Sequence, residues 1–322
     1  MEKISRYQFL TSFGVNYQNT YMVAGSDQQI FVFQFKEGII KQMKILWNHK
    51  DYILTLNFFK WNQIFISGSR DGSFILWSIN LLQNGKYLLK VSAHSGFINC
   101  IALPKSTENF VISGSNDSTI KIWSSYNNSF SQFSCSQKIT EHSQCVFGLS
   151  INNSGNQFLS CGKDGLILVI EKCLSQNWIL KQRIQYLGFG YRISYLSDLI
   201  FSFQPTFPQP NNYLLIYQLD PRTQLYVQVQ QLLVKGGGQG CTTNFPMLYN
   251  SFQNVLLDKN GTYLNIISFD REQEYNYQFN LENIINFNTD TFYGTMSLNG
   301  EYLITWDTKS VLIQIRKYIS RK

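Results

Sequence analysis

The chain has 322 residues, of which 44% are hydrophobic and 16% aromatic, and its formal net charge is +7 at pH 7. This composition provides a large apolar core and excludes a disordered chain, while the length fits either two average domains or one all-β barrel or propeller. The sequence has no run near the roughly 18 apolar residues of a membrane span, and its first ten residues lack the apolar stretch of a secretory signal.

The cysteines indicate the compartment. None is paired in a C-x-x-C motif, and several lie in apolar runs such as "FINCIAL" and "CVFGLS". We expect buried, small apolar side chains in a reducing environment, with neither a disulfide framework nor a metal site. The expected location is therefore intracellular, in the cytoplasm, with the nucleus left open. The six cysteines are Cys100, Cys135, Cys145, Cys161, Cys173 and Cys241.

Taken from the N-terminus, the first half of the chain repeats one pattern four times. "VAGSDQQIFVF" (23–33) is followed by the closer pair "ISGSRDGSFILW" (66–77) and "ISGSNDSTIKIW" (112–123), and then by "LSCGKDGLILVI" (159–170). The aspartates of the last three copies, Asp71, Asp117 and Asp164, lie 46 and 47 residues apart. Such a fixed period indicates a repeat architecture.

Each copy predicts two strands joined by a hairpin turn. In the third copy, "FVIS" and "TIKIW" are strands, and the polar run "SNDS" between them tolerates the backbone angles of a tight turn. A period of about 46 residues built from short strands is typical of a four-stranded propeller blade. A ring of such blades buries their faces and leaves no long exposed sheet edge.

The second half of the chain repeats more weakly. A copy is hidden at about 185–233, and the runs "LLDKNGTYLNIISFD" (256–270) and "SLNGEYLITWD" (297–307) share an apolar segment followed by x-x-Gly. This alignment places Asp270 and Asp307 at positions equivalent to Asp71. Seven units of 46 residues result, although six or eight remain open.

These residues resemble the WD40-repeat family of seven-bladed β-propellers across essentially the whole chain. The resemblance implies an all-β fold with four-stranded antiparallel blades in a single domain (1–322), closed by pairing of the N-terminal strand with the last blade. It also implies a hydrogen-bonded tetrad of His, Ser, Asp and Trp that stabilises each blade. The matching residues are His49, Ser67, Asp71 and Trp77, then His94, Ser113, Asp117 and Trp123, and finally His142, Ser160 and Asp164 with Ile170 in place of Trp.

The chain departs from the family pattern at three points. Ser78 and Ser124 follow the two tetrad tryptophans, where the family has Asp. The dipeptide Trp306-Asp307 aligns instead with a turn between the second and third strands. The fifth to seventh units lack the histidine, so their assignment depends on the apolar pattern.

Few residues of the sequence are candidates for catalysis or metal binding. The three histidines lie 45 and 48 residues apart at tetrad positions, and the aspartates at 27, 71, 117, 164, 270 and 307 would be spread around the ring. Both sets are interpreted as structural, so we predict no catalytic residue, no metal and no cofactor. The glycine-rich run "KGGGQG" (235–240) lacks the Lys-Ser/Thr of a phosphate-binding loop and is interpreted as a flexible loop.

Two interruptions of the repeat are candidates for partner binding. "FQPTFPQPNN" (203–212) replaces the tight turn of the fifth unit, and a connection of about 18 residues (234–251) joins the fifth unit to the sixth. Both should be neighbours on the face formed by b–c turns and d–a connections, where the strands of a blade are lettered a to d. Alternatively, their aromatic side chains pack back onto the propeller. The candidate anchors are Phe203, Pro205, Phe207, Pro208, Phe245 and Tyr249, of which residues 205–208 match P-x-x-P.

A second candidate surface is a cluster of cations that closure would bring together on the opposite face. It could attract an acidic protein, anionic lipid or nucleic acid, or it could be solvated charge that keeps the chain soluble. Nucleic acid is disfavoured, because no basic run is interleaved with aromatic residues. The cluster comprises Lys3, Arg6, Arg316, Lys317, Arg321 and Lys322.

The sequence favours a non-enzymatic interaction scaffold, a subunit or adaptor in a larger intracellular protein complex. The alternatives are an enzyme that uses the central channel, a ubiquitin-ligase substrate receptor and a nucleic-acid-associated propeller. The apolar inner strands argue against the enzyme. Ubiquitin-ligase substrate receptors of this family usually carry an adaptor-docking arginine shortly after the tetrad tryptophan. Neither "WSIN" nor "WSSY" contains one.

Overall fold

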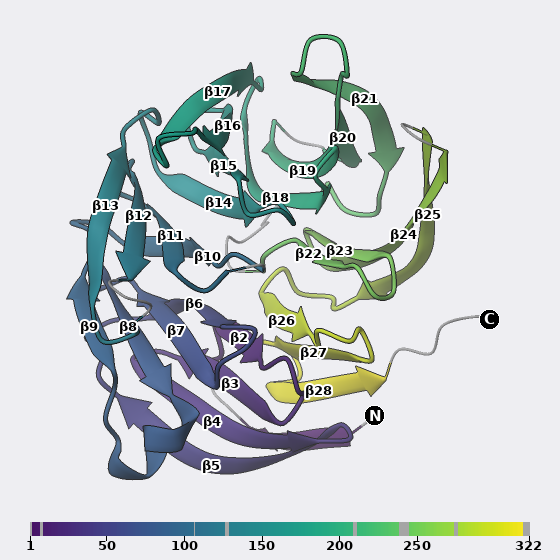
Figure 1. Cartoon of the computed structure of the whole chain (residues 1–322). Coiled ribbons are helices and arrows are strands. Elements are labelled where there is room, and N and C mark those ends of the chain that lie inside the picture. The colour runs from purple at the N-terminus through teal and green to yellow at the C-terminus, as the bar shows by residue number, and fades with distance from the viewer. Residues whose placement is uncertain are drawn as a thin grey trace.

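A ring of seven four-stranded antiparallel sheets surrounds a central axis (Figure 1). The computed structural model describes residues 2–6, 9–105, 107–125, 129–208, 211–237, 245–273 and 276–317, with the backbone alone at 2–6, 271–273 and 276. The predicted all-β propeller of seven blades is confirmed, and the copy hidden at 185–233 is the fifth blade.

The strands follow in chain order from the inner strand a to the outer strand d of each blade. Blades one to three contain β2 (Ser12–Val15), β3 (Tyr21–Ser26), β4 (Gln29–Lys36) and β5 (Ile39–Trp47); β6 (Ile53–Phe58), β7 (Ile64–Ser69), β8 (Ser73–Ser78) and β9 (Leu89–Ser92); and β10 (Ile98–Ala102), β11 (Phe110–Ser115), β12 (Ile120–Ser125) and β13 (Phe133–Ile139). A short 3₁₀ helix, η1 (Ile79–Asn84), lies between β8 and β9.

The other four blades have the same order, except that the outer strand of blade seven is β1, the first strand of the chain. They contain β14 (Val146–Ile151), β15 (Gln157–Gly162), β16 (Leu166–Lys172) and β17 (Trp178–Gln185); β18 (Phe189–Ser197), β19 (Ile200–Phe207), β20 (Tyr213–Leu219) and β21 (Tyr226–Leu233); β22 (Leu248–Asn250), β23 (Val255–Asn260), β24 (Tyr263–Gln273) and β25 (Asn276–Asn286); and β26 (Phe292–Met296), β27 (Tyr302–Asp307), β28 (Leu312–Lys317) and β1 (Glu2–Arg6).

The ring is closed by its first strand. β1 pairs antiparallel with β28, with Lys3 opposite Gln314 and Ile4 opposite Ile313, and so supplies the outer strand of blade seven. The predicted closure is confirmed, and it pairs the edge of β28 that the last blade would otherwise expose.

The turn chemistry predicted for the repeats is present. Asp71 and Gly72 form the b–c turn of blade two, where Gly72 has a φ of +75° and a Cβ atom would lie 2.4 Å from the carbonyl oxygen of His94. Ser118 occupies the matching turn position in blade three with a φ of +65°. The turn therefore requires a residue that tolerates the left-handed region, and glycine is needed where the next connection packs closely.

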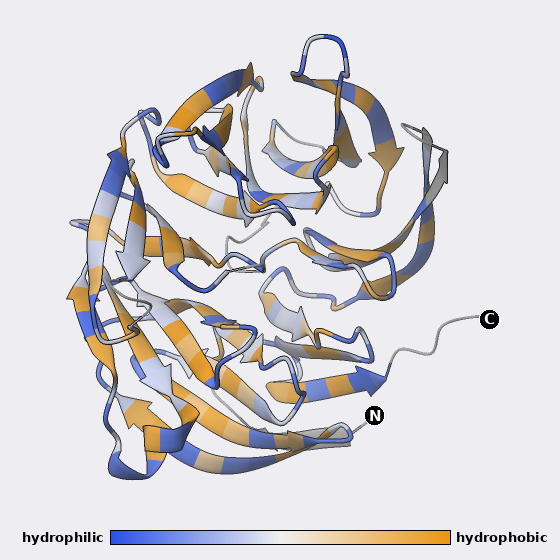
Figure 2. Ribbon diagram, viewed as in Figure 1, coloured by the Kyte–Doolittle hydropathy of each residue, from blue (hydrophilic) through white to orange (hydrophobic). Residues whose placement is uncertain are grey.

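The core lies between neighbouring blades. Val23 and Val32 of blade one pack with Phe65 and Trp77 of blade two in one buried cluster. Outer strands bury few residues, only Ile40 and Leu46 in β5 and Trp178 in β17, and Figure 2 shows hydrophilic residues among the hydrophobic ones along both strands. Each blade thus buries both faces of its inner strands against its neighbours, and this explains why the ring must close.

Blade six differs from its prediction. Asp270 lies within the third strand, β24, opposite Gln278 of β25, and is not at a b–c turn. The b–c hairpin is formed by Asn260 and the residues after it, since Asn260 pairs with Tyr263. The prediction was wrong because x-x-Gly marks an a–b connection in blades four and seven but the b–c turn in blade six. The period would have found it, because Asn260 lies 47 residues before Asp307.

Candidate partner-binding site

The tetrad residues of blades two and three lie in continuous hydrogen-bonded chains. In blade three, Trp123 Nε1 donates to Ser113 Oγ at 2.9 Å, and His94 Nε2 lies 2.7 Å from that hydroxyl. His94 Nδ1 lies 2.9 Å from Asp117 Oδ2. Blade two has the same chain, with 2.7 Å between His49 and Ser67 and 3.1 Å between His49 and Asp71.

The hydrogen bonds of the tetrad and its burial determine the protonation states of His94 and Asp117. Burial lowers the pKa of His94 despite the charge of Asp117, so the imidazole is neutral near pH 7. Burial alone would raise the pKa of Asp117, but the hydrogen bond from Thr119 and the proximity of His94 outweigh it and lower the pKa to about 2. The imidazole therefore donates Nδ1–H to a carboxylate and accepts the Ser113 hydroxyl at Nε2, which leaves neither nitrogen for proton transfer.

Blade four has three of the four tetrad residues and the hydrogen bonds between them. His142 lies 2.8 Å from Ser160 and 3.0 Å from Asp164, while Ile170 is fully buried where the tryptophan would stand. Trp178 of β17 packs edge-on against Phe158, with ring centroids 5.0 Å apart, and both belong to the same buried cluster as Ile170. The serine hydroxyl thus loses its indole donor, but the blade keeps its aromatic packing.

Blades five and six contain buried charges that sequence reasoning missed. Arg192 of β18 is 1% exposed, and its Nε donates to the carbonyl oxygen of Phe245 at 2.7 Å. Asp258 of β23 is fully buried, and its Oδ2 accepts from Asn265 at 3.3 Å. Burial raises the pKa of Asp258 to about 7, even though Arg192 acts to lower it. In the sequence, these buried charges are marked only by a charged residue within an otherwise apolar strand.

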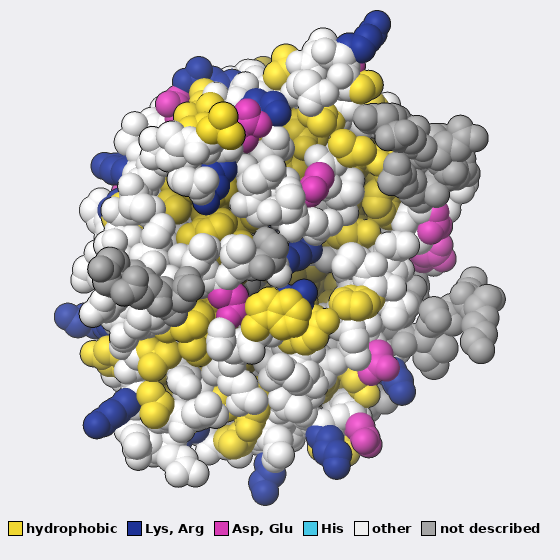
Figure 3. Space-filling model, viewed as in Figure 1, with side chains coloured by type: hydrophobic (Ala, Val, Ile, Leu, Met, Phe, Trp, Pro, Cys, Tyr) yellow, Lys and Arg dark blue, Asp and Glu magenta, His cyan; other side chains and the backbone are white. Residues whose placement is uncertain are grey.

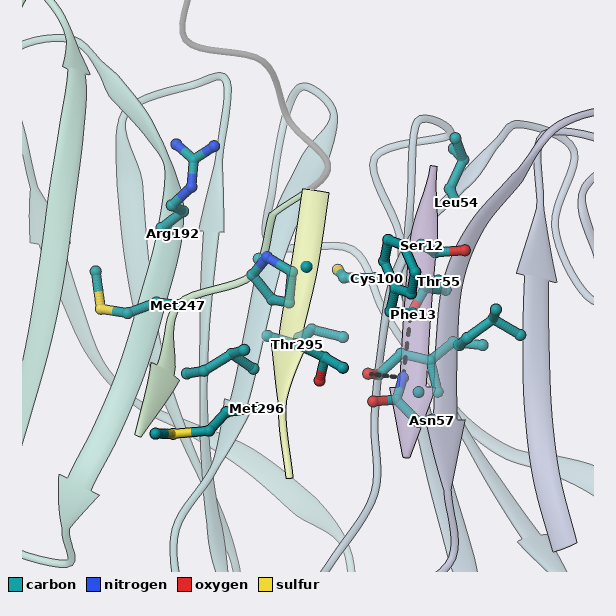
Figure 4. A pocket seen from close by; sticks show the side chains of 18 of the residues that line it. Ser12, Phe13, Leu54, Thr55, Asn57, Cys100, Arg192, Met247, Thr295 and Met296 are labelled. Atoms are coloured by element: carbon teal, nitrogen blue, oxygen red, sulfur yellow. Dashed lines mark hydrogen bonds between the residues drawn. The ribbon is translucent and has the colours of Figure 1, made fainter. Parts of the chain in front are cut away.

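The inner strands of all seven blades line a central cavity of about 250 Å³. Figure 4 shows Arg192 and Met247 on one side of this cavity, with Phe13, Thr55 and Asn57 across it. Asn57 Nδ2 donates to Thr55 Oγ1 and to the carbonyl oxygen of Ile101, so the amide is held in place. The lining is more polar than the apolar inner strands predicted.

Metal ligands do not gather in the part of the chain that the structure describes, where no three His, Cys, Asp or Glu side chains form a group. Within the same residues, no helix is long and apolar enough to cross a membrane. The described cysteines are free thiols; Cys161 is buried, but Cys135 is exposed, so the expectation that all are buried was wrong. Cys241 lies outside the described residues.

The structure separates the six candidate anchors. Phe203 and Phe245 are 1% and 0% exposed, and Pro205 is also buried, so these three are core residues and not interface anchors. Residues 200–207 form β19, so the P-x-x-P segment is part of a strand and not an exposed polyproline helix. Tyr249 is half-buried, and its hydroxyl donates to Asn254. Phe207 and Pro208 are exposed, as an anchor must be.

The two interruptions of the repeat lie side by side, as predicted. Asn260 Nδ2 donates to the carbonyl oxygen of Asn211 at 2.8 Å, and the amide N–H of Gly237 donates to Asn260 Oδ1 at 3.2 Å. The b–c turn of blade five and the start of the glycine-rich connection are therefore tied to the b–c turn of blade six. Residues 209, 210 and 238–244, which belong to these two segments, lie outside the described residues.

An aromatic row extends from Phe207 towards the central cavity. The Phe207 ring stacks on Phe189 with centroids 5.9 Å apart, Phe189 lies 5.6 Å from Tyr191, and Tyr191 lies 4.7 Å from Phe147. Phe147 and Tyr191 also line the central cavity. We define the aromatic row as Phe147, Phe189, Tyr191 and Phe207. The sequence analysis missed the first three, although the run "LGFGYR" (187–192) carries aromatic residues at alternate positions.

The outer end of the aromatic row borders an open pocket of about 470 Å³ between blades four and five. Leu187 is 87% exposed beside it and Phe207 is 54% exposed, while Lys163 supplies an exposed ammonium group. No ion pair among the described residues involves Lys163. The pocket therefore offers apolar contacts and one cation on the face formed by b–c turns and d–a connections.

The cation cluster is only partly described. Arg316 is half-buried, and its guanidinium donates to Thr305 Oγ1 at 2.6 Å and to Gln314 Oε1 at 2.5 Å, so it is occupied within its own blade. Lys317 is exposed. The strand pairing brings the backbones of Lys3 and Arg6 beside β28, but their side chains lie outside the described residues, as do Arg321 and Lys322.

Comparison with known proteins identifies the repeats. Residues 40–78, 85–124 and 133–171 match the family "WD domain, G-beta repeat". A ribosome biogenesis protein WDR12 homolog of Chlamydomonas reinhardtii is 34% identical over 120 residues, covering 36% of this chain and 26% of that protein. Transducin beta-like protein 3 of Mus musculus is 30% identical over 80 residues, covering 25% of this chain and 10% of that protein.

A third relative, the WD repeat-containing protein 26 homolog of Arabidopsis thaliana, is 29% identical over 37% of this chain and 20% of its own length. The matches thus span about a quarter or less of these relatives. A chain in the crystal structure of the Mitotic Checkpoint Complex has the same fold, with a TM-score of 0.73 over 98% of this chain and 89% of that chain at 13% identity. Residues 40–171 therefore contain three repeats of the WD40 family, and the described chain as a whole folds as a seven-bladed β-propeller.

Proposed function

We propose that this chain is a non-catalytic subunit or adaptor of an intracellular protein complex and that it binds a partner protein through the aromatic row. The observation that carries the proposal is the exposed end of this row. Phe207 and Leu187 are 54% and 87% exposed beside an open pocket, yet Phe207 is stacked on Phe189. Aromatic side chains that are already held in place lose little conformational entropy on binding, which favours them as anchors.

The relatives support the coarse part of the proposal. A protein named for ribosome biogenesis is similar to 36% of this chain, and a chain in the structure of the Mitotic Checkpoint Complex shares its fold. We propose an intracellular location because ribosome biogenesis, for which this relative is named, takes place inside the cell. The tetrad geometry supports a structural role for the histidines, because their ring nitrogens are engaged by serine and aspartate side chains.

The proposal is tested by photo-cross-linking in the native cell. A photoreactive p-benzoylphenylalanine replaces Leu187 in the tagged full-length chain, and the control replaces Leu174, which is 101% exposed in the β16–β17 connection. We expect protein adducts at position 187 that are not formed at position 174. Phe207→Ala, made in the Leu187 variant, should remove most of these adducts without lowering the melting temperature.

The same adducts from both positions, or adducts that persist in the Phe207→Ala variant, would contradict the proposal. Point substitutions are preferred to a deletion of residues 203–211, because residues 203–207 belong to the buried strand β19. Such a deletion would remove part of the core of blade five, so a loss of binding would not report on the surface.

A further inference from the structure

The a–b connections form the end of the ring opposite the aromatic row, and they expose large apolar side chains. Trp61 is 61% exposed between β6 and β7, Phe252 is 65% exposed between β22 and β23, and Leu298 is 38% exposed between β26 and β27. Exposed single residues of this kind are common, but several on adjacent connections indicate an interaction surface.

Contacts between the connections make these side chains one continuous arc. Asn250 at the end of β22 donates from Nδ2 to the carbonyl oxygens of Ser297 and Leu298, which ties blade six to blade seven. Residues 18–21 of blade one line a common pocket with Asn299, Glu301 and Tyr302 of blade seven. Tyr17 lies 5.9 Å from the Trp61 ring of blade two, measured between ring centroids. In the view of Figure 3, hydrophobic side chains gather around the middle of the ring beside Lys and Arg side chains.

Trp61 is held in its exposed position. Glu108, from the a–b connection of blade three, accepts from the Trp61 backbone amide at 2.5 Å and also from the side-chain amide of Asn62. Lys60 places its ammonium 4.1 Å from the centroid of the Trp61 ring, and Tyr17 packs on the indole. An indole fixed by its neighbours provides contact area with little loss of conformational entropy.

The charges around Trp61 are mainly positive. Lys60 precedes Trp61 in the chain, and Lys105 lies on the same a–b connection of blade three as Glu108, which contacts Trp61. Burial and the nearby charge of Lys60 lower the pKa of Lys105. The carboxylate of Glu108 is engaged by Trp61 and Asn62. No ion pair within the described residues involves Lys60 or Lys105. Two neighbouring ammonium groups beside an exposed indole would be complemented by carboxylates, which a partner could supply.

We propose that Trp61, Phe252 and Leu298, together with Lys60 and Lys105, form a second docking surface that binds an acidic segment of a partner protein with apolar side chains. In this arrangement the apolar residues of the segment contact Trp61, Phe252 and Leu298, while its carboxylates pair with Lys60 and Lys105. The surface lies at the opposite end of the ring from the aromatic row, so it does not depend on the function proposed above. A chain with both surfaces would bridge two proteins.

The test is a selection from a random library of 12-residue peptides, using the purified full-length chain as bait. We expect the recovered peptides to be enriched in Asp and Glu together with Leu, Ile, Phe or Trp. In fluorescence anisotropy, Trp61→Ala should weaken their binding at least tenfold, and Lys60→Glu with Lys105→Glu should do the same. Trp47→Ala is the matched control, because Trp47 is 62% exposed on the outer strand β5, and it should leave binding unchanged.

Four results would overturn this proposal. The recovered peptides could lack acidic enrichment, or Trp61→Ala could bind them as well as the unaltered chain does. A decamer of uridine could bind with a Trp61-dependent affinity higher than that of every peptide, which would make the surface a nucleic-acid site. Peptides lost with Phe207→Ala but kept with Trp61→Ala would refute this surface alone and would support the aromatic row.

Discussion

At the scale of the residue, the buried charge of Asp258 distinguishes blade six from the tetrad blades. Its carboxyl group is fully buried, and among the described residues only Oδ2 has a hydrogen-bond partner, Asn265. The tetrad aspartate Asp117 receives bonds from Thr119 and lies against His94, so its pKa falls, whereas burial raises the pKa of Asp258 to about 7. Burial raises the pKa of both carboxyl groups, and hydrogen bonding to the charged form decides whether the net pKa falls or rises.

Asp258 should make the chain less stable at pH 8 than at pH 5. The native pKa of about 7 exceeds the ordinary value of 3.8, so the folded state holds the proton more tightly. The stabilisation is complete below about pH 4 and is lost as the pH rises through 7, by up to about 4 kcal/mol for a shift of roughly three units. Urea unfolding between pH 5 and pH 8 measures this slope.

Asp258→Asn is the comparison, because an amide of similar shape does not titrate. Its free energy of unfolding should vary less over the same pH range than that of the unaltered chain. The overall level could fall, since Arg192 would lose a neighbouring carboxylate, but the slope is what tests the pKa. All other titratable groups are common to both proteins, so their contribution cancels in the difference. Parallel pH profiles would show that Asp258 does not titrate in this range.

At the scale of the element, we propose that each tetrad stabilises the blade that contains it. Asp117→Asn keeps the shape of the turn but removes the carboxylate that accepts from His94 Nδ1 and Thr119 Oγ1. We expect the free energy of unfolding to fall by about 2 to 3 kcal/mol, which lowers the melting temperature by several degrees. Differential scanning calorimetry of the purified chain would measure it.

Asp27→Asn is the matched control for this substitution. Asp27 lies at the b–c turn between β3 and β4 with a φ of +49°, but blade one has no histidine before its inner strand. Asn tolerates the same backbone conformation, so Asp27→Asn should change the melting temperature little. If the two substitutions lower it equally, turn geometry and not the hydrogen-bonded chain explains the role of Asp117.

How well an element could be predicted depended on how many independent signals it carried. Blades two and three combine a period, a polar turn and four tetrad residues, and their strands lie where the pattern placed them. Blade six carried only an apolar run with x-x-Gly, a signal that both kinds of turn satisfy, so Asp270 was assigned to the wrong turn. Local turn chemistry identifies a hairpin, but its place in the blade requires the distance to the neighbouring repeats.

The candidate site was harder to predict than the fold, for a physical reason. Both faces of the inner strands are buried between blades, so alternation along β19 does not mark an exposed face. Phe203 and Pro205 are buried in the core, while Phe207 is exposed because β19 ends there. Exposure at the end of a strand depends on the packing of the neighbouring connection, here residues 186–189, which a single strand's sequence does not contain.

At the scale of the whole molecule, the ring depends on one short strand. β1 covers Glu2–Arg6 and pairs with β28, so residues at the start of the chain complete the blade formed by residues 292–317. Each of the other six blades takes all of its strands from consecutive residues. Closure therefore joins the two most distant parts of the sequence and makes the unfolding of blades one and seven interdependent.

Removing residues 1–8 should weaken the whole ring. The deletion leaves the edge of β28 unpaired, and an exposed edge strand recruits strands from other molecules. We expect a melting temperature lower by several degrees and aggregation that increases with protein concentration, measured by scanning calorimetry and light scattering. A synthetic peptide of residues 1–8 should restore much of the loss by pairing with β28, whereas a scrambled peptide should not. A truncated chain that melts at the original temperature and stays monomeric would show that packing between blades suffices without this strand.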